Sequence, residues 1–329
     1  MLIISQQEVV ELLPMDECMA VMADALTSLA RGDALLPLRT MLHLPRDLGI
    51  LATMPGYLGD PEALGIKVIT VFPGNHDTEF DSHQGVVLLF ETGHGSPVAM
   101  MDASAVTAIR TAAVSGVATG LLARTGAKDL CILGSGVQAR THLAAMLFAR
   151  RIDRVRVWSR NAENARIFAR DAHERHGIVV EVHGDARNAV EGSDIVCTVT
   201  ASREPVLFSE WLKPGAHVNA VGASLRTARE LDSATMARAK LFVDRRESAL
   251  NEAGDFLIPR GEGLFGDDHI RAEIGEVLAG THGGRASETE ITVFKSLGLA
   301  VEDVAAAQHV HYRALERGLG TTVLLGGRR

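Results

Sequence analysis

The chain has 329 residues, of which 47% are hydrophobic and 22% are charged, and its formal net charge is −8. This length and composition predict a globular protein with two domains. The acidic balance and the lack of a lysine/arginine cluster argue against nucleic acid as a partner, because binding phosphates requires clustered cations.

Local sequence patterns also argue against a membrane span, a signal peptide and a metal site. We see no apolar run of about 18 residues, so no bilayer-spanning segment is expected. The first residues lack a basic region before their apolar run, so no signal peptide is expected. Cys18, Cys131 and Cys197 are far apart, which predicts reduced thiols and a cytoplasmic location. The 13 histidines are scattered, and no metal site is expected.

The N-terminal third changes from helical to strand patterns and back. Ser5 and Glu8 form a capping-box pattern that predicts a short helix, and residues 15–32 predict an amphipathic helix ending at Gly32. Between residues 35 and 100, short apolar runs separated by Gly, Pro and Asp predict one mixed or antiparallel sheet. Residues 103–124 then predict a helix.

From residue 129 onward, strands and helices alternate. Apolar strands are predicted at 129–134, 154–159, 179–183, 194–201, 217–223 and 239–244, and the intervening segments include two amphipathic helices. This alternation predicts a doubly wound, parallel α/β sheet covered on both faces. The last strong pattern, at 300–318, predicts a helix.

A glycine-rich turn separates the first of these strands from its helix. Gly134, Gly136 and Ala139 fit the G-x-G-x-x-G/A pattern, which in this strand–turn–helix context predicts a dinucleotide-binding turn. The pyrophosphate would bind the free N–H groups at the start of the helix. A plain turn between a strand and a helix is the alternative.

The end of the second strand indicates which dinucleotide is bound. Ser159, Arg160 and Asn161 stand where an NAD site places an acid for the ribose hydroxyls. A guanidinium there favours a 2′-phosphate, so NADPH is preferred and NADH remains possible. Alternatively, Arg160 is a solvated loop cation.

Three cations lie in apolar surroundings. Lys67 is in the middle of a predicted strand, Arg110 lies on the apolar stripe of the helix at 103–124, and Arg39 lies between apolar segments. A buried cation needs an anion or must lose its proton. Together with a nucleotide domain, these residues predict a pocket for a small carboxylate such as an amino or imino acid. Each one also has a structural interpretation, as a lysine extending to solvent or an arginine paired with an internal carboxylate.

Two further residues are candidates for proton transfer. Asp244 ends a late strand of the parallel sheet, at the edge where such sheets bind ligands. It would move a proton or bind a substrate amine, unless it only forms a turn. His83, in a loop, would bind substrate or donate a proton, although a loop histidine is more often structural.

The motifs taken together resemble the ornithine cyclodeaminase/mu-crystallin family over nearly the whole chain. The resemblance rests on ten segments of the sequence: PLRT, TMPGYL, GIKVITVFPGN, SHQGVVLLFE, AVTAIRTAAVSG, CILGSGVQA, VWSRNAENA, WLKPGAHVNAVGA, FVDRRESALNEAGD and TVFKSLGLAVED. It implies a homodimer. It also implies a substrate and dimerisation domain formed by residues 1–117 and 296–329, and a Rossmann domain over 118–295.

The resemblance also implies roles for single residues. Arg39, Lys67 and Arg110 match the residues that bind the substrate carboxylate, and Asp244 matches the catalytic aspartate of the cyclodeaminases. The predicted catalytic residues are Lys67 and Asp244. The predicted coenzyme-binding residues are Thr111, Gly134, Gly136, Val137, Gln138, Ser159, Arg160, Asn161, Thr200, Ala201, Val221 and Lys295.

Two departures from the cyclodeaminase pattern favour a reductase. Ala52 stands where cyclodeaminases carry a glutamate that helps hold the substrate amine, and the second strand ends without the acid that suits NAD. We therefore expect an NAD(P)H-dependent reductase of a C=N bond next to a carboxylate, in a cyclic ketimine or a linear imino acid. The alternatives are an ornithine cyclodeaminase that uses NAD catalytically, an alanine-dehydrogenase-like enzyme, and a non-catalytic NADPH-dependent binding protein.

Overall fold

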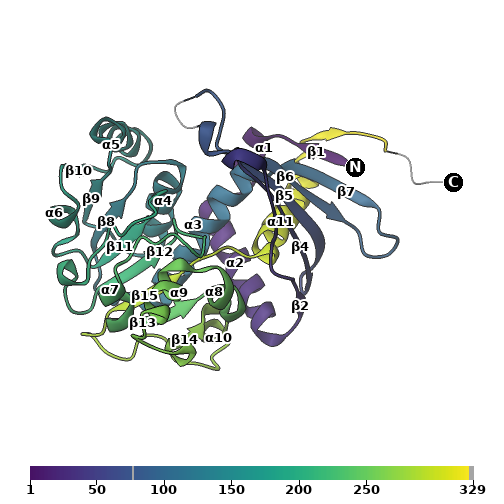
Figure 1. The fold of residues 1–329 in the computed structure, drawn as a ribbon. Helices are drawn as coiled ribbons and strands as arrows, with labels where there is room; N and C mark the ends of the chain where they lie inside the picture. Colours follow the sequence, from purple (N-terminus) through teal and green to yellow (C-terminus); the bar gives the residue numbers. More distant parts are fainter. Residues whose placement is uncertain (76–77, 326–329) are drawn as a thin grey trace. The chain divides into compact units, whose positions relative to one another are not determined.

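The protein is described from a computed structural model that defines residues 1–75 and 78–325. The chain forms two compact units, coloured along the sequence in Figure 1. The first unit comprises Met1–Arg110 and the chain from Leu299 onward, and the second comprises Thr111–Gly298. The first division lies within helix α3 (Ala103–Leu122), seven residues before the boundary expected after residue 117.

A mixed sheet forms the centre of the first unit. Its strands in spatial order are β16 (Thr321–Thr322), β1 (Leu2–Ile4), β7 (Pro97–Asp102), β6 (His83–Phe90), β5 (Glu62–Val71), β4 (Ile50–Gly59) and β2 (Ala34–Leu35), with β3 (Thr40–His43) also paired to β4. Neighbouring strands are antiparallel except β1 and β7, which are parallel. The predicted mixed sheet is therefore confirmed.

Among the described residues of this unit there are three α-helices besides the start of α3. They are α1 (Gln6–Leu12), α2 (Met15–Arg31) and α11 (Ala300–Arg317). The Ser5–Glu8 capping box begins α1, and Gly32 ends α2 in the left-handed conformation, both as predicted. Helix α11 lies across β4, β5 and β6 and packs against α2, so it covers one face of the sheet. Its N-terminal turn is consequently buried.

The second unit is built on a parallel sheet, as predicted. Its order is β10 (Val180–His183), β9 (Arg154–Trp158), β8 (Asp129–Leu133), β11 (Ile195–Thr198), β12 (His217–Ala220), β15 (Thr292–Lys295), β13 (Lys240–Val243) and β14 (Ile270–Glu273). Its helices are α4 (Val137–Ala149), α5 (Ala162–His176), α6 (Ala186–Val190), α7 (Ser233–Arg238), α8 (Arg246–Glu252), α9 (Gly254–Gly261) and α10 (Ile274–Leu278). Sequence analysis did not identify β14, β15 or the helices α8 to α10.

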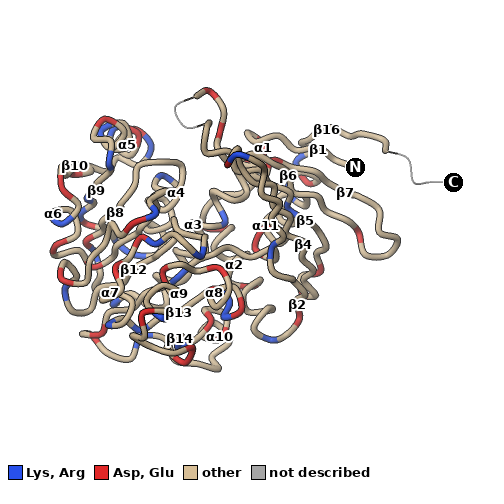
Figure 2. The backbone as a smooth tube through the Cα atoms, viewed as in Figure 1, with Lys and Arg blue, Asp and Glu red and all other residues tan. Residues whose placement is uncertain are grey.

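The distribution of charge agrees with the sequence. Figure 2 shows Lys and Arg interspersed with Asp and Glu along both units. Helix α3 is long and apolar enough to match a bilayer span, and 83% of its 18-residue apolar window is buried inside the protein. The core helix of a globular protein has the same composition, so the apolar character of α3 is accounted for by burial.

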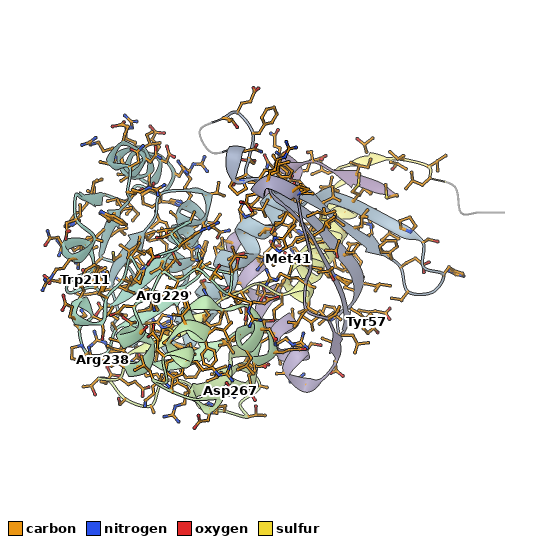
Figure 3. All side chains as sticks on the ribbon, viewed as in Figure 1. Met41, Tyr57, Trp211, Arg229, Arg238 and Asp267 are labelled. Atoms are coloured by element: carbon orange, nitrogen blue, oxygen red, sulfur yellow. The ribbon has the colours of Figure 1, made fainter. Side chains whose placement is uncertain are left out.

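Two strands of the first unit bring predicted residues near one another. Figure 3 labels Met41 on β3 and Tyr57 on β4. Strand β3 pairs with β4 so that Met41 lies opposite Ala52, the position where cyclodeaminases carry glutamate. Arg39 immediately precedes β3, and Lys67 lies opposite Met54 on the other side of β4.

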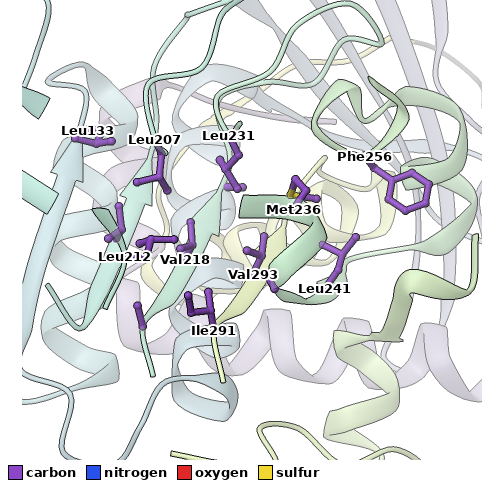
Figure 4. Close-up of a cluster of buried hydrophobic side chains, with 14 of the residues drawn as sticks. Leu133, Leu207, Leu212, Val218, Leu231, Met236, Leu241, Phe256, Ile291 and Val293 are labelled. Atoms are coloured by element: carbon purple, nitrogen blue, oxygen red, sulfur yellow. The ribbon is translucent and has the colours of Figure 1, made fainter. Parts of the chain in front are cut away.

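A cluster of buried aliphatic side chains supports the parallel sheet. It includes Leu133, Val218, Leu241 and Val293, from four different strands (Figure 4). All four are fully buried, which is expected for a sheet covered by helices on both faces. This core holds the strands in register, so the loops at their carboxyl ends are fixed relative to one another.

Candidate functional site

Lys67 occupies the buried face of β5. The pleat places it on the same side as Ala63 and Ile69, and only 2% of its surface is exposed. Its ammonium lies 2.6 Å from Oδ2 of Asp303 and donates to the Thr107 hydroxyl at 3.5 Å. A buried ammonium needs such a partner, and the Asp303 carboxylate supplies it.

Arg110 lies on the buried stripe of α3, as the helical spacing predicted. Its Nε donates to Oδ1 of Asp303 at 2.9 Å, and its Nη1 donates to Oε2 of Glu302 at 2.7 Å. Asp303 therefore bridges Lys67 and Arg110 through its two oxygens. Both carboxylates are fully buried at the start of α11. For Arg110 the structure thus contains the internal ion pairs that sequence analysis named as the structural alternative. The alternative for Lys67, a side chain that extends to solvent, is wrong, because Lys67 is buried.

Glu302 and Asp303 were not identified as site residues from the sequence. The available signal was their position in the apolar segment LGLAVEDVAAA, where two adjacent acids have no basic residue nearby in sequence. Buried acids require cationic partners. Those partners are on β5 and α3, so only the packing of α11 on the sheet reveals them.

The charges of the predicted substrate-binding residues act on one another within the first unit. Burial lowers the pKa of Lys67 to about 8, the charge of Asp303 opposes this, and the charges of Arg110 and Arg39 lower it further. Desolvation and the Lys67 charge also lower the pKa of His83. The name basic cluster is used below for six residues: Arg39, Lys67, Arg110, His83, Glu302 and Asp303.

In the second unit, the glycine turn has the backbone that a dinucleotide site needs. Gly134 has φ +122°, and a Cβ there would lie 2.7 Å from the Val199 carbonyl oxygen. Gly136 is the N-cap of α4 without a side-chain capping hydrogen bond, and a Cβ there would meet nothing within 4 Å. No side chain caps the start of α4 and the space beside Gly136 is open, so the turn fits a pyrophosphate.

Three predicted coenzyme residues lie in the helices α3 and α4. Val137 and Gln138 are the first residues of α4, directly after the glycine turn, and Thr111 is buried in α3. Val137 is exposed, whereas the side-chain oxygen of Gln138 is buried without a hydrogen-bond partner in the described structure. Such an orphaned acceptor next to the turn is consistent with a ligand that carries donor groups.

The three predicted coenzyme residues after β9 differ in their contacts and exposure. The Ser159 hydroxyl accepts a hydrogen bond from the Ser135 hydroxyl at 2.9 Å, which ties the second strand to the glycine turn. Asn161 caps α5 by accepting from the N–H groups of Glu163 and Asn164, so it has a structural role there. Arg160 is exposed between them. Its position is compatible with a 2′-phosphate and equally with a solvated cation.

The late strands place the other predicted residues at their carboxyl ends. Thr200 and Ala201 follow β11, and Val221 follows β12. Lys295 ends β15 but is fully buried, with Nζ 3.0 Å from Oδ2 of Asp255 and donating to the Ala223 carbonyl at 2.6 Å. Its ammonium therefore supports the loop after β12, and its contact with a coenzyme stays a prediction.

Asp244 follows β13 and is 1% exposed. One carboxylate oxygen accepts from the N–H groups of Leu297 and Gly298, at 2.5 and 2.8 Å, and the other accepts from the N–H of Arg245. These contacts fix the carboxylate beside the chain that leaves β15. They agree with the turn-forming alternative, and the proton-transfer role stays a prediction.

Comparison with known proteins identifies the relatives of this chain. The family model described as "Ornithine cyclodeaminase/mu-crystallin family" matches residues 1–318. A Delta(1)-pyrroline-2-carboxylate reductase of Bacillus cereus is 40% identical over 98% of this chain and 99% of its own. The ketimine reductase mu-crystallin of Mus musculus is 45% identical over 85% of each chain.

A solved structure matches the fold of the whole chain. The Delta(1)-pyrroline-2-carboxylate reductase of Thermococcus litoralis, in complex with NADH and L-proline, superposes with a TM-score of 0.96. It is 42% identical, and the match covers 98% of this chain and 100% of that one. The resemblance found in the sequence motifs is thereby confirmed, and this chain belongs to the ornithine cyclodeaminase/mu-crystallin family.

Proposed function

We propose that this protein reduces the C=N bond of a cyclic imine that carries a carboxylate on the imine carbon, with a nicotinamide coenzyme as hydride donor. Pyrroline-2-carboxylate and piperideine-2-carboxylate are the candidate substrates. The observation that carries the proposal is the full-length similarity to a reductase whose structure holds NADH and L-proline. Pyrroline-2-carboxylate becomes proline when it gains a hydride at C2 and a proton at nitrogen, so these two ligands represent one reaction.

The basic cluster would bind and orient the substrate. Arg39, Lys67 and Arg110 would attract its carboxylate, and Asp303 with Glu302 would keep two of these cations in fixed positions. When bound, the coenzyme supplies the hydride. The imine nitrogen must carry a proton for efficient hydride attack, and Lys67 Nζ or the Asp244 carboxyl would hold that proton.

The second unit would bind the coenzyme. The N–H groups after Gly136, which no side chain caps, would hold the pyrophosphate, and the loops after β11 and β12 would border the nicotinamide. NADPH is the proposed preference, with NADH accepted, because Arg160 replaces the usual acid. Arg160→Asp should raise the Kd of NADPH at least about tenfold and leave that of NADH nearly unchanged. Equal losses for both coenzymes would refute the 2′-phosphate assignment.

A substrate panel followed at the NADPH absorbance band tests the reaction. We expect stoichiometric loss of absorbance with pyrroline-2-carboxylate or piperideine-2-carboxylate. An ornithine well with ammonia detection, and a pyruvate well with ammonia, test the lyase and amino-acid dehydrogenase alternatives. Ammonia release from ornithine without net loss of NADPH would contradict the proposal, and so would NADPH binding without turnover of any imine.

We further propose a homodimer located in the cytoplasm. Exposed apolar side chains at the edge of the mixed sheet, Leu35 on β2 and Leu42 on β3, support a self-associating face. Three buried, free cysteines are compatible with a reducing compartment. Light scattering coupled to size exclusion would give the mass of a monomer if the dimer proposal is wrong.

A further inference from the structure

A buried carboxylate that no motif identified connects two loops of the second unit. Glu230 lies between β12 and α7 and is fully buried. Its Oε1 accepts from the N–H and the hydroxyl of Thr200, at 2.6 and 2.7 Å. Its Oε2 accepts from the Thr198 hydroxyl at 2.8 Å and the Gly222 N–H at 2.7 Å. One side chain therefore holds the end of β11 and the residue that follows Val221.

A second carboxylate supports the first from behind. Asp255, at the start of α9, accepts through Oδ1 from the backbone N–H groups of Glu230 and Leu231, at 2.8 and 3.0 Å. Its Oδ2 is paired with Lys295, whose ammonium also donates to Ala223 in the same loop. The neighbouring Arg229, labelled in Figure 3, donates to the Ser233 hydroxyl and anchors the loop to α7. Glu230 is thus fixed both at its backbone and at its carboxylate.

The two loops that Glu230 joins lie where the fold binds dinucleotides. Strands β11 and β12 are parallel neighbours, with Thr198 opposite Ala220, so their carboxyl ends meet at one edge of the sheet. Thr200, Ala201 and Val221 at that edge are predicted to contact the coenzyme. The backbone at Gly222 is closely packed, because a Cβ there would collide with the Thr200 carbonyl and lie 2.6 Å from Glu230 Oε1.

We infer that Glu230 is a positioning residue for the coenzyme: it holds the loops after β11 and β12 at the spacing that the nicotinamide half of the dinucleotide requires. The inference rests on the proposed coenzyme site of the second unit. Each carboxylate oxygen faces one backbone N–H, from Thr200 or from Gly222, and an N–H can only donate, so both oxygens must accept. A glutamine would direct its NH₂ group at one of these N–H groups whichever way it is turned, and the loops would have to separate.

The experiment measures NADH affinity by fluorescence titration, which does not require turnover. For Glu230→Gln we expect the Kd of NADH to rise at least about tenfold, with a matching rise in its KM, while the KM of the imine changes less than about threefold. Thr198→Val removes one donor without altering side-chain shape. It should raise the Kd by about two- to fivefold, and it serves as the readout if the glutamine variant does not fold.

Asp194→Asn is the matched control. Asp194 is also a buried carboxylate that accepts backbone N–H groups, from Lys128 and Asp129, but it lies at the amino end of β11. Its loss should reduce stability and leave the Kd of NADH unchanged. The inference is overturned if the Glu230 and Thr198 variants bind NADH normally, or if the Asp194 control weakens binding as much.

The same data separate this inference from the proposed reaction. Wild-type protein that binds NADH but reduces no imine would contradict the reaction, while the effect of Glu230→Gln on the Kd would still decide the positioning role. Wild-type protein that binds no nicotinamide coenzyme would overturn both.

Discussion

At the scale of single residues, charge pairing decides how the basic cluster works. Lys67 alone in an apolar strand would lose its proton or unfold the strand, because burial disfavours the charged form. Asp303 counteracts this by forming an ion pair with Lys67 at 2.6 Å and by accepting from Arg110 Nε at 2.9 Å. The acids at the start of α11 thus allow two cations to remain charged inside the protein. We regard Asp303 as a positioning residue for both.

Asp303→Asn should change the pH dependence of substrate binding. The pKa of Lys67 is about 8, and the groups that act on it are Asp303 on α11, Arg110 and Thr107 on α3, and Arg39. The contribution of Lys67 to attracting the substrate carboxylate is therefore present below about pH 8 and lost above it. Removing the Asp303 charge lowers the pKa of Lys67, so the rise in the imine KM should begin about one pH unit or more lower.

The measurement is the KM of the imine from pH 6 to 9 for both proteins, with the wild type correcting for titration of the substrate itself. Glu17→Gln is the control, because Glu17 pairs with His309 on another part of α11. Its profile should coincide with that of the wild type. If the Asp303→Asn profile also coincides, Asp303 has no part in setting the charge of Lys67.

At the scale of elements, the strand–turn–helix formed by β8 and α4 contains two glycines with different physical requirements. The backbone conformation at position 134 requires glycine, because φ is +122° and a side chain would collide with Val199. Gly136 has an ordinary backbone, φ −81° and ψ −162°, that any residue adopts. Its glycine is needed only if something must approach the backbone closely.

Substitution by alanine should separate the two roles. Gly134→Ala should reduce the free energy of unfolding by about 1–3 kcal/mol, because of the strained backbone. Gly136→Ala should change stability by less than about 1 kcal/mol yet raise the Kd of NADH at least about tenfold, because its Cβ would occupy the path of the pyrophosphate. Urea unfolding and fluorescence titration check both. Normal coenzyme affinity in Gly136→Ala would show that no anion approaches this turn.

At the scale of the whole molecule, stability and coenzyme binding are linked. A ligand that binds only the folded protein raises the free energy of unfolding by about 2.7 kcal/mol at a concentration of 100 times its Kd. We expect this increase with NADH, seen as a higher urea midpoint. At the same NADH concentration, Glu230→Gln should show a smaller increase. An unchanged midpoint for the wild type, despite saturation in the titration, would contradict binding to the native state alone.

Much of the architecture could be predicted from local patterns. The capping box at Ser5, the stop at Gly32 and the turn at Gly134 all depend on residues within a few positions of one another, so their physics is contained in short segments. The burial of Lys67 and Arg110 also followed from periodicity. Strands β14 and β15 were missed because each has four residues, too few for a periodic pattern to distinguish a strand from a loop.

What the sequence by itself determined is the family, the fold class and the side chains that face the core, because periodicity, glycine placement and motif order are properties of neighbouring residues. The tertiary structure alone decided which charges pair. Asp303 is 236 positions from Lys67, and Glu230 is 32 from Thr198, yet each pair is in direct contact. Long-range packing creates those contacts, and a buried charge depends on the partner that packing brings to it.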